Sequence, residues 1–153
     1  MSTLVSIRNL HKTYQRGPEK VDVLRGIDLD IEKGDFVALM GPSGSGKTTL
    51  LNLIGGLDSP TSGSIEVDGG RIDNLGSGQL AQWRSNNVGF VFQFYNLMPT
   101  LTGQKNVELP LLLTRLSAAD RKRNAAIALE LVGLKDRGGH RPNELSGGQQ
   151  QRV

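Results

Sequence analysis

The stretch GPSGSGKT, residues 41–48, constrains this chain more than any other part of its sequence. It fits the pattern G-x-x-x-x-G-K-[ST] in full, with a compact apolar run at residues 34–40 before it and leucines at helical spacing after it. The alternative is a Gly/Ser-rich turn with an incidental lysine, but a chance match to the whole pattern is rare in a chain of this length. A strand, a glycine-rich turn and a helix in this order predict a phosphate-binding loop.

The residue types of this loop suit phosphate chemistry. Glycines let the backbone curl so that successive N–H groups point at phosphate oxygens, and the start of the next helix adds a partial positive charge. Lys47 is expected to reach the β- and γ-phosphates of a nucleotide, and the Thr48 hydroxyl is a fitting Mg²⁺ ligand. The predicted nucleotide contacts of the loop are Gly41, Pro42, Ser43, Gly44, Ser45, Gly46, Lys47, Thr48 and Thr49. Kinases, GTPases, helicases and transport ATPases share such loops, so the motif alone does not identify the function.

The composition indicates a soluble globular protein. The chain has 153 residues, which suits one domain, with 22% charged and 37% hydrophobic residues. It has no cysteine, which excludes disulfides and cysteine-based metal sites. The formal charge of +3 is more typical of a solvated surface than of a nucleic-acid interface, and RKR at residues 121–123 fits the solvent face of a helix. Neither a signal peptide nor an apolar run of membrane-spanning length is evident, which favours the cytoplasm.

Hydrophobic periodicity divides the chain into a β-rich part, residues 1–93, and a helical part, residues 94–153, which we expect to be subdomains of one domain. Strands are predicted at residues 4–10, at 22–34 with a bend at Gly26, and at 34–40, 63–69 and 87–93. The strands at 34–40 and 87–93 are expected to be buried on both faces, because they are compact apolar runs.

Helices are predicted after the phosphate loop and at residues 77–86, 102–116 and 117–134. Ser77 and Ser117 are the expected N-caps of the second and last of these, with Asp120 at the capping-box position. Gly133 is the expected C-cap, and residues 135–144 are rich in turn formers and predict a loop.

Further stretches carry a family resemblance. Tyr14 stands in HKTY, Gln93 ends VGFVFQ, PTSGSIEVDG lies between the phosphate loop and Gln93, and LSGGQ occupies residues 145–149. In this order and spacing the whole chain resembles the nucleotide-binding domain of ABC transporters. The resemblance implies an α/β fold: a P-loop NTPase core with an antiparallel β subdomain and an α-helical subdomain. The finer pattern resembles the branch of lipoprotein-release and macrolide-export ATPases.

The resemblance implies roles for residues outside the loop. Tyr14 would stack on adenine, the alternative being a half-buried tyrosine at a strand end. Gln93 would contact Mg²⁺ and the attacking water, so that Lys47 and Gln93 are the expected catalytic residues and Thr48 and Gln93 the metal ligands; an ordinary polar strand end is the alternative for Gln93. FYNLMP, residues 94–99, would line the groove that receives a cytoplasmic helix of the membrane partner. Core or loop packing is the alternative for this stretch.

LSGGQ would open a helix that faces the ATP bound by a second subunit. The residues concerned are Ser146, Gly147, Gly148 and Gln149. A helix cap is the alternative, and it explains Ser146 but not the pentapeptide. The resemblance therefore implies an ATP- and Mg²⁺-binding homodimer, paired head to tail, that sits on the inner face of the cell membrane through a transmembrane permease subunit and does not bind nucleic acid.

In the family pattern an apolar strand ending in Asp, then Glu and a later His follow LSGGQ, and the sequence stops at Val153 before them. We therefore expect the N-terminal part of an ATP hydrolase subunit, C-terminally truncated. The missing strand should lie beside the phosphate-loop strand at the centre of the sheet, and its loss is expected to expose the apolar flanks of FVALM, residues 36–40, and VGFVF, residues 88–92. Two alternatives remain at this stage. One is a non-catalytic nucleotide-binding module, and the other is a soluble ABC protein of DNA repair or translation.

Overall fold

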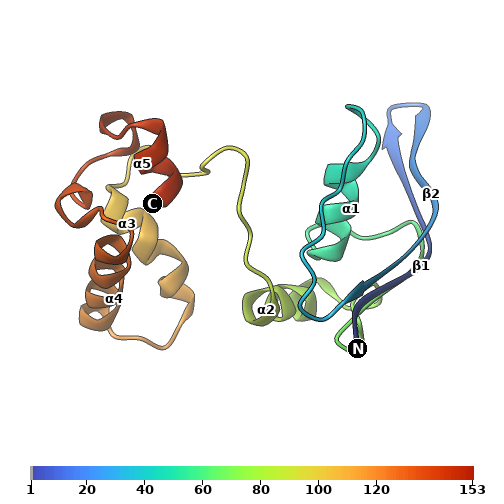
Figure 1. The fold of residues 1–153 in the computed structure, drawn as a ribbon, viewed down its shortest axis with the longest axis horizontal. Coiled ribbons are helices and arrows are strands. Elements are labelled where there is room, and N and C mark those ends of the chain that lie inside the picture. Colours follow the sequence, from blue (N-terminus) through green and yellow to red (C-terminus); the bar gives the residue numbers. More distant parts are fainter. Residues whose placement is uncertain (1) are drawn as a thin grey trace. The chain divides into compact units, whose positions relative to one another are not determined.

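The computed structural model describes residues 2–153, which form two compact units, residues 2–90 and residues 91–153. Figure 1 shows strands and helices in the first unit and helices alone in the second.

The sheet of the first unit has the strand order β2-β1-β3-β4, and every neighbouring pair is antiparallel. Its strands are β1 (Thr3–Arg16), β2 (Glu19–Glu32), β3 (Ser62–Val67) and β4 (Gly70–Arg71). β1 and β2 are a long hairpin, and β1 is central because it pairs with both β2 and β3. The strands predicted near residues 4–10, 22–34 and 63–69 are confirmed.

The bend predicted at Gly26 is confirmed as a β-bulge. Leu10 pairs with Ile27 and His11 with Arg25, so that Gly26 is an extra residue on β2. Its φ of 78° lies in the region that favours glycine. A Cβ at this position would come 3.2 Å from the Asn9 side-chain oxygen, so the close approach also favours glycine.

Two helices complete the first unit: α1 (Lys47–Ile54) and α2 (Ser77–Asn87). The helix predicted after the phosphate loop is α1, which lies beside the β1–β2 hairpin in Figure 1. The side chains of α1, α2 and the sheet share one apolar core, which buries Val5, Ile7, Leu10, Leu24, Leu50, Leu53, Ile65, Ile72 and Leu80. The predicted N-cap of α2, Ser77, is wrong. Gly76 is the N-cap and Ser77 the first helical residue, and the Gln79 side chain accepts the Gly76 N–H at 3.1 Å.

The predictions of buried strands at residues 34–40 and 87–93 are wrong for this structure. Residues 34–40 have no regular structure, and α2 extends to Asn87 before another irregular stretch. A strand needs neighbours for its backbone hydrogen bonds, and among the described residues the sheet consists of β1 to β4 alone. Phe36 is 99% exposed and Val91 94% exposed, so neither side chain is buried as the strand predictions required.

The second unit is helical. Its elements are α3 (Gly103–Glu108), η1 (Leu109–Leu113), α4 (Ala118–Leu131), η2 (Lys135–Arg137), η3 (Pro142–Glu144) and α5 (Gly147–Arg152). The helix predicted at residues 102–116 is confirmed only in part, because the chain tightens into the 3₁₀ helix η1 where Pro110 enters. Proline has no N–H for an α-helical hydrogen bond. The predicted loop at residues 135–144 contains two short 3₁₀ turns.

The predicted start and end of α4 are largely confirmed. Ser117 is the N-cap, with its Oγ accepting from the Asp120 N–H at 3.1 Å, but the Asp120 carboxylate accepts from the Ser117 hydroxyl, not from its backbone N–H. The C-cap is Val132, and Gly133 follows with φ 72°. The Leu134 N–H then reaches the Leu129 carbonyl at 2.7 Å, which closes a Schellman motif. The buried apolar residues of this unit are Ala125, Leu129, Leu134 and Leu145.

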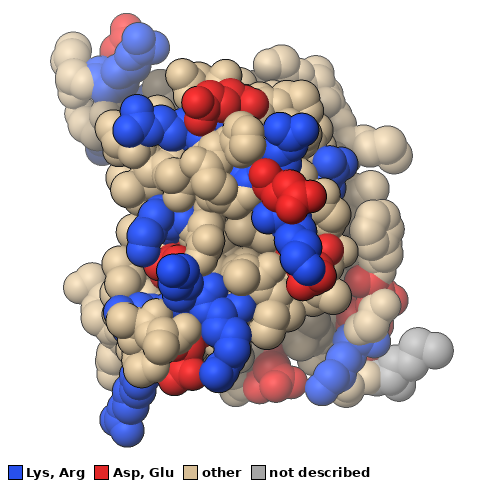
Figure 2. All heavy atoms as spheres, turned by 90° about the vertical axis from the view of Figure 1, so that its left-hand side faces the viewer, with Lys and Arg blue, Asp and Glu red and all other residues tan. Residues whose placement is uncertain are grey.

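Charges of both signs are mixed over the face of the helical unit shown in Figure 2. Several belong to ion pairs along or near helices, with 2.7 Å between charged atoms: Lys105–Glu108, Arg123–Asp120 and Lys135–Glu130. Residues 121–123 lie on α4, as the sequence predicts. None of the helices that the structure describes is both long and apolar enough to span a membrane.

Candidate phosphate-binding site

The loop from Gly41 to Gly46 depends on glycines with positive φ: 155° at Gly41, 81° at Gly44 and 89° at Gly46. Gly46 has a second reason to be glycine, since a Cβ there would lie 2.8 Å from Leu24 Cδ2 and 3.2 Å from the Val23 carbonyl oxygen. Contacts below 3.0 Å force a shift, so the loop packs against β2 only because Gly46 has no side chain. The sheet thereby fixes the place where α1 begins.

The N-terminus of α1 is a suitable anion site. Its N-cap is Gly46, and no side chain of residues 2–153 caps the helix start by a hydrogen bond. The first N–H groups of a helix have no partner within the helix, and they carry the positive end of its dipole. Backbone donors and positive potential therefore coincide at Lys47, Thr48 and Thr49, as phosphate binding requires.

Lys47 extends back over its own loop. Its Nζ donates to the carbonyl oxygens of Gly41 at 2.8 Å and Pro42 at 2.7 Å. The ammonium group therefore lies beside the curled backbone and adds a full positive charge there. A cavity of about 350 Å³ opens at this place, lined by Val23, Ser43, Gly44, Gly46, Lys47, Thr48 and Thr49. Six of the nine predicted loop residues thus line this cavity, while Gly41, Pro42 and Ser45 line a second one, which shares Gly46 and Lys47 with it.

Tyr14 lies on β1, 38% exposed, and its hydroxyl donates to Asp58 Oδ2 at 2.6 Å. The pKa of Tyr14 is raised, chiefly because its hydroxyl binds the Asp58 carboxylate and further because of burial, while the Thr49 hydroxyl acts in the opposite direction. Thr49 also lines the cavity at the loop. The structure therefore places Tyr14 beside the start of α1, within one unit.

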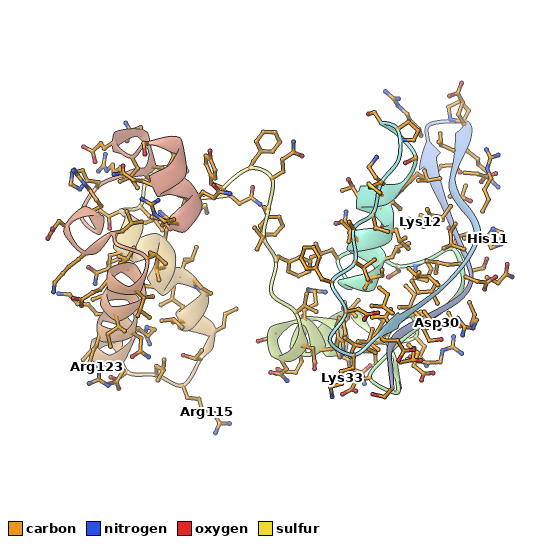
Figure 3. The ribbon with its side chains drawn as sticks, viewed as in Figure 1. His11, Lys12, Asp30, Lys33, Arg115 and Arg123 are labelled. Atoms are coloured by element: carbon orange, nitrogen blue, oxygen red, sulfur yellow. The ribbon has the colours of Figure 1, made fainter. Side chains whose placement is uncertain are left out.

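The sequence analysis did not predict that Lys12 and Asp58 lie beside Tyr14. Lys12 donates to Asp58 Oδ1 at 2.7 Å, and its Nζ lies 4.7 Å from the centre of the Tyr14 ring. Figure 3 shows Lys12 on the side of β1 that faces α1, with His11 on the other side. The available signal was the i, i+2 spacing of Lys12 and Tyr14, which puts two side chains on one face of a strand. Asp58 gives no comparable signal, because its partners are far away in sequence.

The other candidate residues lie in the helical unit. Gln93 is exposed in a stretch without regular structure. Ser146 is the N-cap of α5: its Oγ accepts from the Gln149 N–H at 3.3 Å, and the Gln149 side chain accepts from the Ser146 N–H at 2.9 Å. LSGGQ thus opens a helix, as predicted. Gly147 is close to Tyr95, whose hydroxyl would lie 3.1 Å from a Cβ at that glycine.

Comparison with known proteins places this arrangement in a family. The family described as ABC transporter matches residues 24–153. An uncharacterized ABC transporter ATP-binding protein of Bacillus subtilis, YknY, is 51% identical over 98% of this chain and 65% of its own length. The macrolide export ATP-binding/permease protein MacB of Brucella melitensis is 50% identical over 98% of this chain and 23% of its own length. The lipoprotein-releasing system ATP-binding protein LolD of Legionella pneumophila is 47% identical over 98% of this chain and 66% of its own length.

Solved structures agree. A dimeric post-hydrolysis structure of the ATP-binding cassette MJ0796, bound to ADP and Pi, matches with a TM-score of 0.85 and 44% identity, over 97% of this chain and 66% of that one. This likeness confirms the predicted α/β P-loop NTPase fold. The chain spans 65% of the length of the Bacillus relative, so the match does not by itself give the activity of a whole protein.

Proposed function

Because the chain belongs to the ABC transporter family, we propose that it is the ATP-binding part of a transporter subunit that binds MgATP and, in the whole protein, hydrolyses it to drive a membrane partner. The observation that carries this proposal is the cavity at the phosphate loop. There an uncapped helix start, a curled glycine-rich backbone and the Lys47 ammonium group converge on one place. Residues 1–93 and 94–153 are then the β-rich and helical parts of one domain.

Within this proposal the loop residues Gly41 to Thr49 bind the phosphates, and Lys47 approaches the β- and γ-phosphates. Tyr14 stacks on adenine, a role supported by its place beside Thr49 at the cavity. A tyrosine ring offers an apolar face for a purine, and its hydroxyl is already satisfied by Asp58. The phosphate and base sites are then 35 residues apart in sequence at Tyr14 and Thr49 but adjacent in the fold.

The residues present also fit a magnesium ion. Thr48 is an exposed hydroxyl at the first turn of α1 and lines the cavity, and hard oxygen donors are the ligands that Mg²⁺ prefers. Bound there, the ion would neutralise charge that develops on the phosphoryl oxygens. Gln93 is proposed as a second ligand and as the group that orients the attacking water, on the resemblance alone. Lys47 and Gln93 are accordingly the proposed catalytic residues of this chain.

We further propose that Ser146, Gly147, Gly148 and Gln149 face the ATP of a second subunit in a head-to-tail homodimer. The structure of Ser146 permits this role, because an oxygen that accepts the Gln149 N–H can still donate its own hydrogen to a phosphate. The dimeric state of the MJ0796 cassette supports pairing. A permease subunit at the inner face of the cell membrane is the proposed partner, supported by the ATP-binding/permease architecture in the name of the Brucella relative.

Within the family we propose that the chain belongs to the branch of ATPases that act in macrolide export and lipoprotein release. The identities of 50% to MacB and 47% to LolD support this branch. The name of the first gives macrolide export and the name of the second a lipoprotein-releasing system, and so export or lipoprotein release is the proposed activity of the whole protein.

Nucleotide binding can be tested by the phosphate dependence of affinity. We expect ATP and ADP to bind the chain in the presence of Mg²⁺ and AMP to bind at least about tenfold more weakly, because the loop recognises a β-phosphate. Equilibrium dialysis with the three radiolabelled nucleotides measures this order. Equal affinity for AMP and ATP would contradict the assignment of the cavity. Phosphate release by the whole protein, measured with and without its permease, then separates a hydrolase from a non-catalytic binding module.

A further inference from the structure

An interlocked polar cluster joins β1 to the segment after α1, and it consists of Lys12, Tyr14, Asp58 and Ser59. Asp58 uses both carboxylate oxygens: Oδ1 accepts from Lys12 Nζ and from the Ser59 N–H, each at 2.7 Å, and Oδ2 accepts from the Tyr14 hydroxyl at 2.6 Å. Lys12 Nζ also donates to the Ser59 carbonyl oxygen at 2.6 Å. Every member of the cluster is therefore held by at least one other.

The burial of these groups is unusual for charged side chains. Lys12 is only 9% exposed, and the side chain of Asp58 is 29% exposed. Buried charges persist in proteins when they are paired and hydrogen-bonded, as both are here. The carboxylate is stable as an anion: burial raises the pKa of Asp58, but the bonds from Lys12 and Tyr14 lower that pKa by more. The cluster is thus a fixed element of the fold and not a pair of mobile surface charges.

The cluster connects the two parts of the proposed nucleotide site. Asp58 lies four residues after the last residue of α1, and its N–H binds the Asn52 carbonyl within that helix. The other end of α1 begins at the phosphate loop. Tyr14 projects from β1, so Asp58 ties a side chain of the sheet to the helix that carries the phosphate-binding residues.

The ring of Tyr14 is restrained at two points. Its hydroxyl is bound by Asp58, and the ammonium group of Lys12 lies 4.7 Å from the ring centre, a distance at which a cation is attracted to an aromatic ring. A tyrosine ring that is otherwise 38% exposed would change rotamer freely without these contacts. A ring that is already ordered loses less conformational freedom when a ligand stacks on it.

We propose that Asp58 and Lys12 are positioning residues that hold the Tyr14 ring in place for a purine base at a fixed distance from the phosphate loop. The inference rests on the proposed function, since it takes Tyr14 as the residue that meets the base. It predicts that the Tyr14 hydroxyl contributes to nucleotide affinity although it does not touch the nucleotide. It also predicts that the contribution passes through Asp58.

The test compares two ligands with the full-length protein: MgATP, which has a base, and magnesium tripolyphosphate, which has only the phosphates. Isothermal titration calorimetry gives the ratio of the two affinities for the wild type and for Tyr14→Ala, Tyr14→Phe, Asp58→Asn and the double variant Tyr14→Phe/Asp58→Asn. Tyr14→Phe keeps the ring and removes only the tethered hydroxyl. Lys33→Ala, at an exposed position after β2, is the matched surface control.

For Tyr14→Ala we expect the ratio to fall roughly tenfold to a hundredfold, the range of an aromatic–base stack. For Tyr14→Phe and for Asp58→Asn we expect it to fall about twofold to tenfold, the cost of ordering one side chain on binding. The double variant should fall no further than Tyr14→Phe alone. Tripolyphosphate affinity should stay unchanged in all of them, which a general loss of folding would not allow.

The outcomes distinguish the role of Tyr14 in base binding from the positioning of its ring by Asp58. An unchanged ratio in Tyr14→Ala would overturn the role of Tyr14 in the proposed function. A loss in Tyr14→Ala with no loss in Tyr14→Phe would leave that role intact and overturn the positioning by Asp58. Equal losses of ATP and tripolyphosphate affinity in Asp58→Asn would also overturn it, since Asp58 would then support the phosphate loop and not the ring.

A spectroscopic measurement tests the contact itself. The chain has two tyrosines, so Tyr95→Phe leaves Tyr14 as the only one that titrates. In that background the absorbance of tyrosinate should show that Asp58→Asn lowers the pKa of Tyr14 toward its ordinary value of 10.0, because the hydroxyl loses its carboxylate partner. No change in this pKa would contradict the tether. For the case that Asp58→Asn destabilises the fold, Lys12→Met/Asp58→Asn removes both charges together and provides a second variant for the same titration.

Discussion

Two helices of this chain begin in glycine-rich stretches, and their first turns differ in chemistry. α1 begins after Gly46, whose φ is 89°, and no described side chain caps it. α5 begins after Ser146, which caps the helix with its own hydroxyl and receives a reciprocal bond from Gln149. Both starts were predicted from sequence to contact ATP. In the structure no described side chain caps the start of α1, whereas at α5 the Ser146 and Gln149 N–H groups are bonded within the chain.

The comparison shows that glycine has a different role at the start of each helix. At α1 glycine is required by positive φ and by the close approach of β2, and no described side chain caps the helix start, which suits it to an anion. At α5 the glycines are helical residues after a conventional cap, and the capping Ser146 hydroxyl still has its own hydrogen to donate to a ligand. We therefore expect α1 to be sensitive to added side chains and to loss of charge, and α5 to loss of its cap.

The largest effect is expected for Gly46→Ala. A Cβ there meets Leu24 at 2.8 Å, and the left-handed conformation is unfavourable for alanine. Overpacking costs about 1–3 kcal/mol and the left-handed backbone about 1–2 kcal/mol, so the free energy of unfolding of the first unit should fall by their sum. Trp83 is the only tryptophan and packs on the core of that unit, so its fluorescence in urea reports this unfolding.

The matched control is Gly148→Ala in α5. No atom of the described residues outside the local helix lies within 4 Å of a Cβ at Gly148, and helical alanine is favoured over glycine by about 1 kcal/mol. The urea transition of Trp83 should not move in this variant. Equal destabilisation by both substitutions would show that the contrast between the two helix starts is wrong.

Lys47→Ala should reduce nucleotide affinity without a comparable loss of stability. The Nζ of Lys47 binds two carbonyl oxygens of the loop, and with ATP it would exchange them for phosphate. A charge-assisted bond is worth about 1.5–3 kcal/mol, which corresponds to a loss of about tenfold to more than a hundredfold. Titration with a fluorescent ATP analogue measures it, with Arg152→Ala in α5 as the cation control. Unchanged affinity in Lys47→Ala would refute the contribution of charge at α1.

The sequence predicts what is local in this fold. The helix that begins after the glycine-rich loop, the Ser117 cap and the helix at LSGGQ depend on residues within one or two turns of each other, and all three were predicted correctly. Residues 34–40 were not, because an apolar run forms a strand only if a neighbour pairs with it, and pairing is set by distant parts of the chain. The same holds for Asp58, whose bonds to Lys12 and Tyr14 span 46 and 44 residues.

Acid should distinguish the two helices, because α1 is anchored by a carboxylate and the cap of α5 is formed by neutral groups. The pKa of Asp58 in the folded chain lies below its ordinary value of 3.8, since the bonds from Lys12 and Tyr14 outweigh burial. A lowered pKa gives stability that is present above pH 3.8 and is lost as the pH falls through the folded-state pKa.

The measurement is the difference in free energy of unfolding between wild type and Asp58→Asn, followed by Trp83 fluorescence. We expect a clear difference at pH 6 that narrows as the pH drops below 3.8. Amide exchange in α5, corrected for its intrinsic pH dependence, should show no step in the same range. If the difference in free energy of unfolding between the two proteins stays constant as the pH falls to the folded-state pKa, the Asp58 charge does not anchor α1.

The smallest effect is expected at the cap of α5. Ser146→Ala removes the acceptor of the Gln149 N–H, and loss of a serine cap costs about 1 kcal/mol, although the 3.3 Å distance favours the lower part of the range. Gln149→Ala removes the reciprocal acceptor at 2.9 Å and leaves the Ser146 hydroxyl in place. Because the two bonds close one ring between the same residues, the double variant should lose less than the sum of the single losses. Amide exchange at Gln149 and Gln150 measures this locally, and the ATP affinity of a single chain should stay at the wild-type value in all three variants.

A loss in the double variant equal to the sum of the two single losses would show that the two bonds act independently. A loss of ATP affinity in the isolated chain would show that Ser146 serves the nucleotide of its own subunit, which would remove the contrast between the two helix starts.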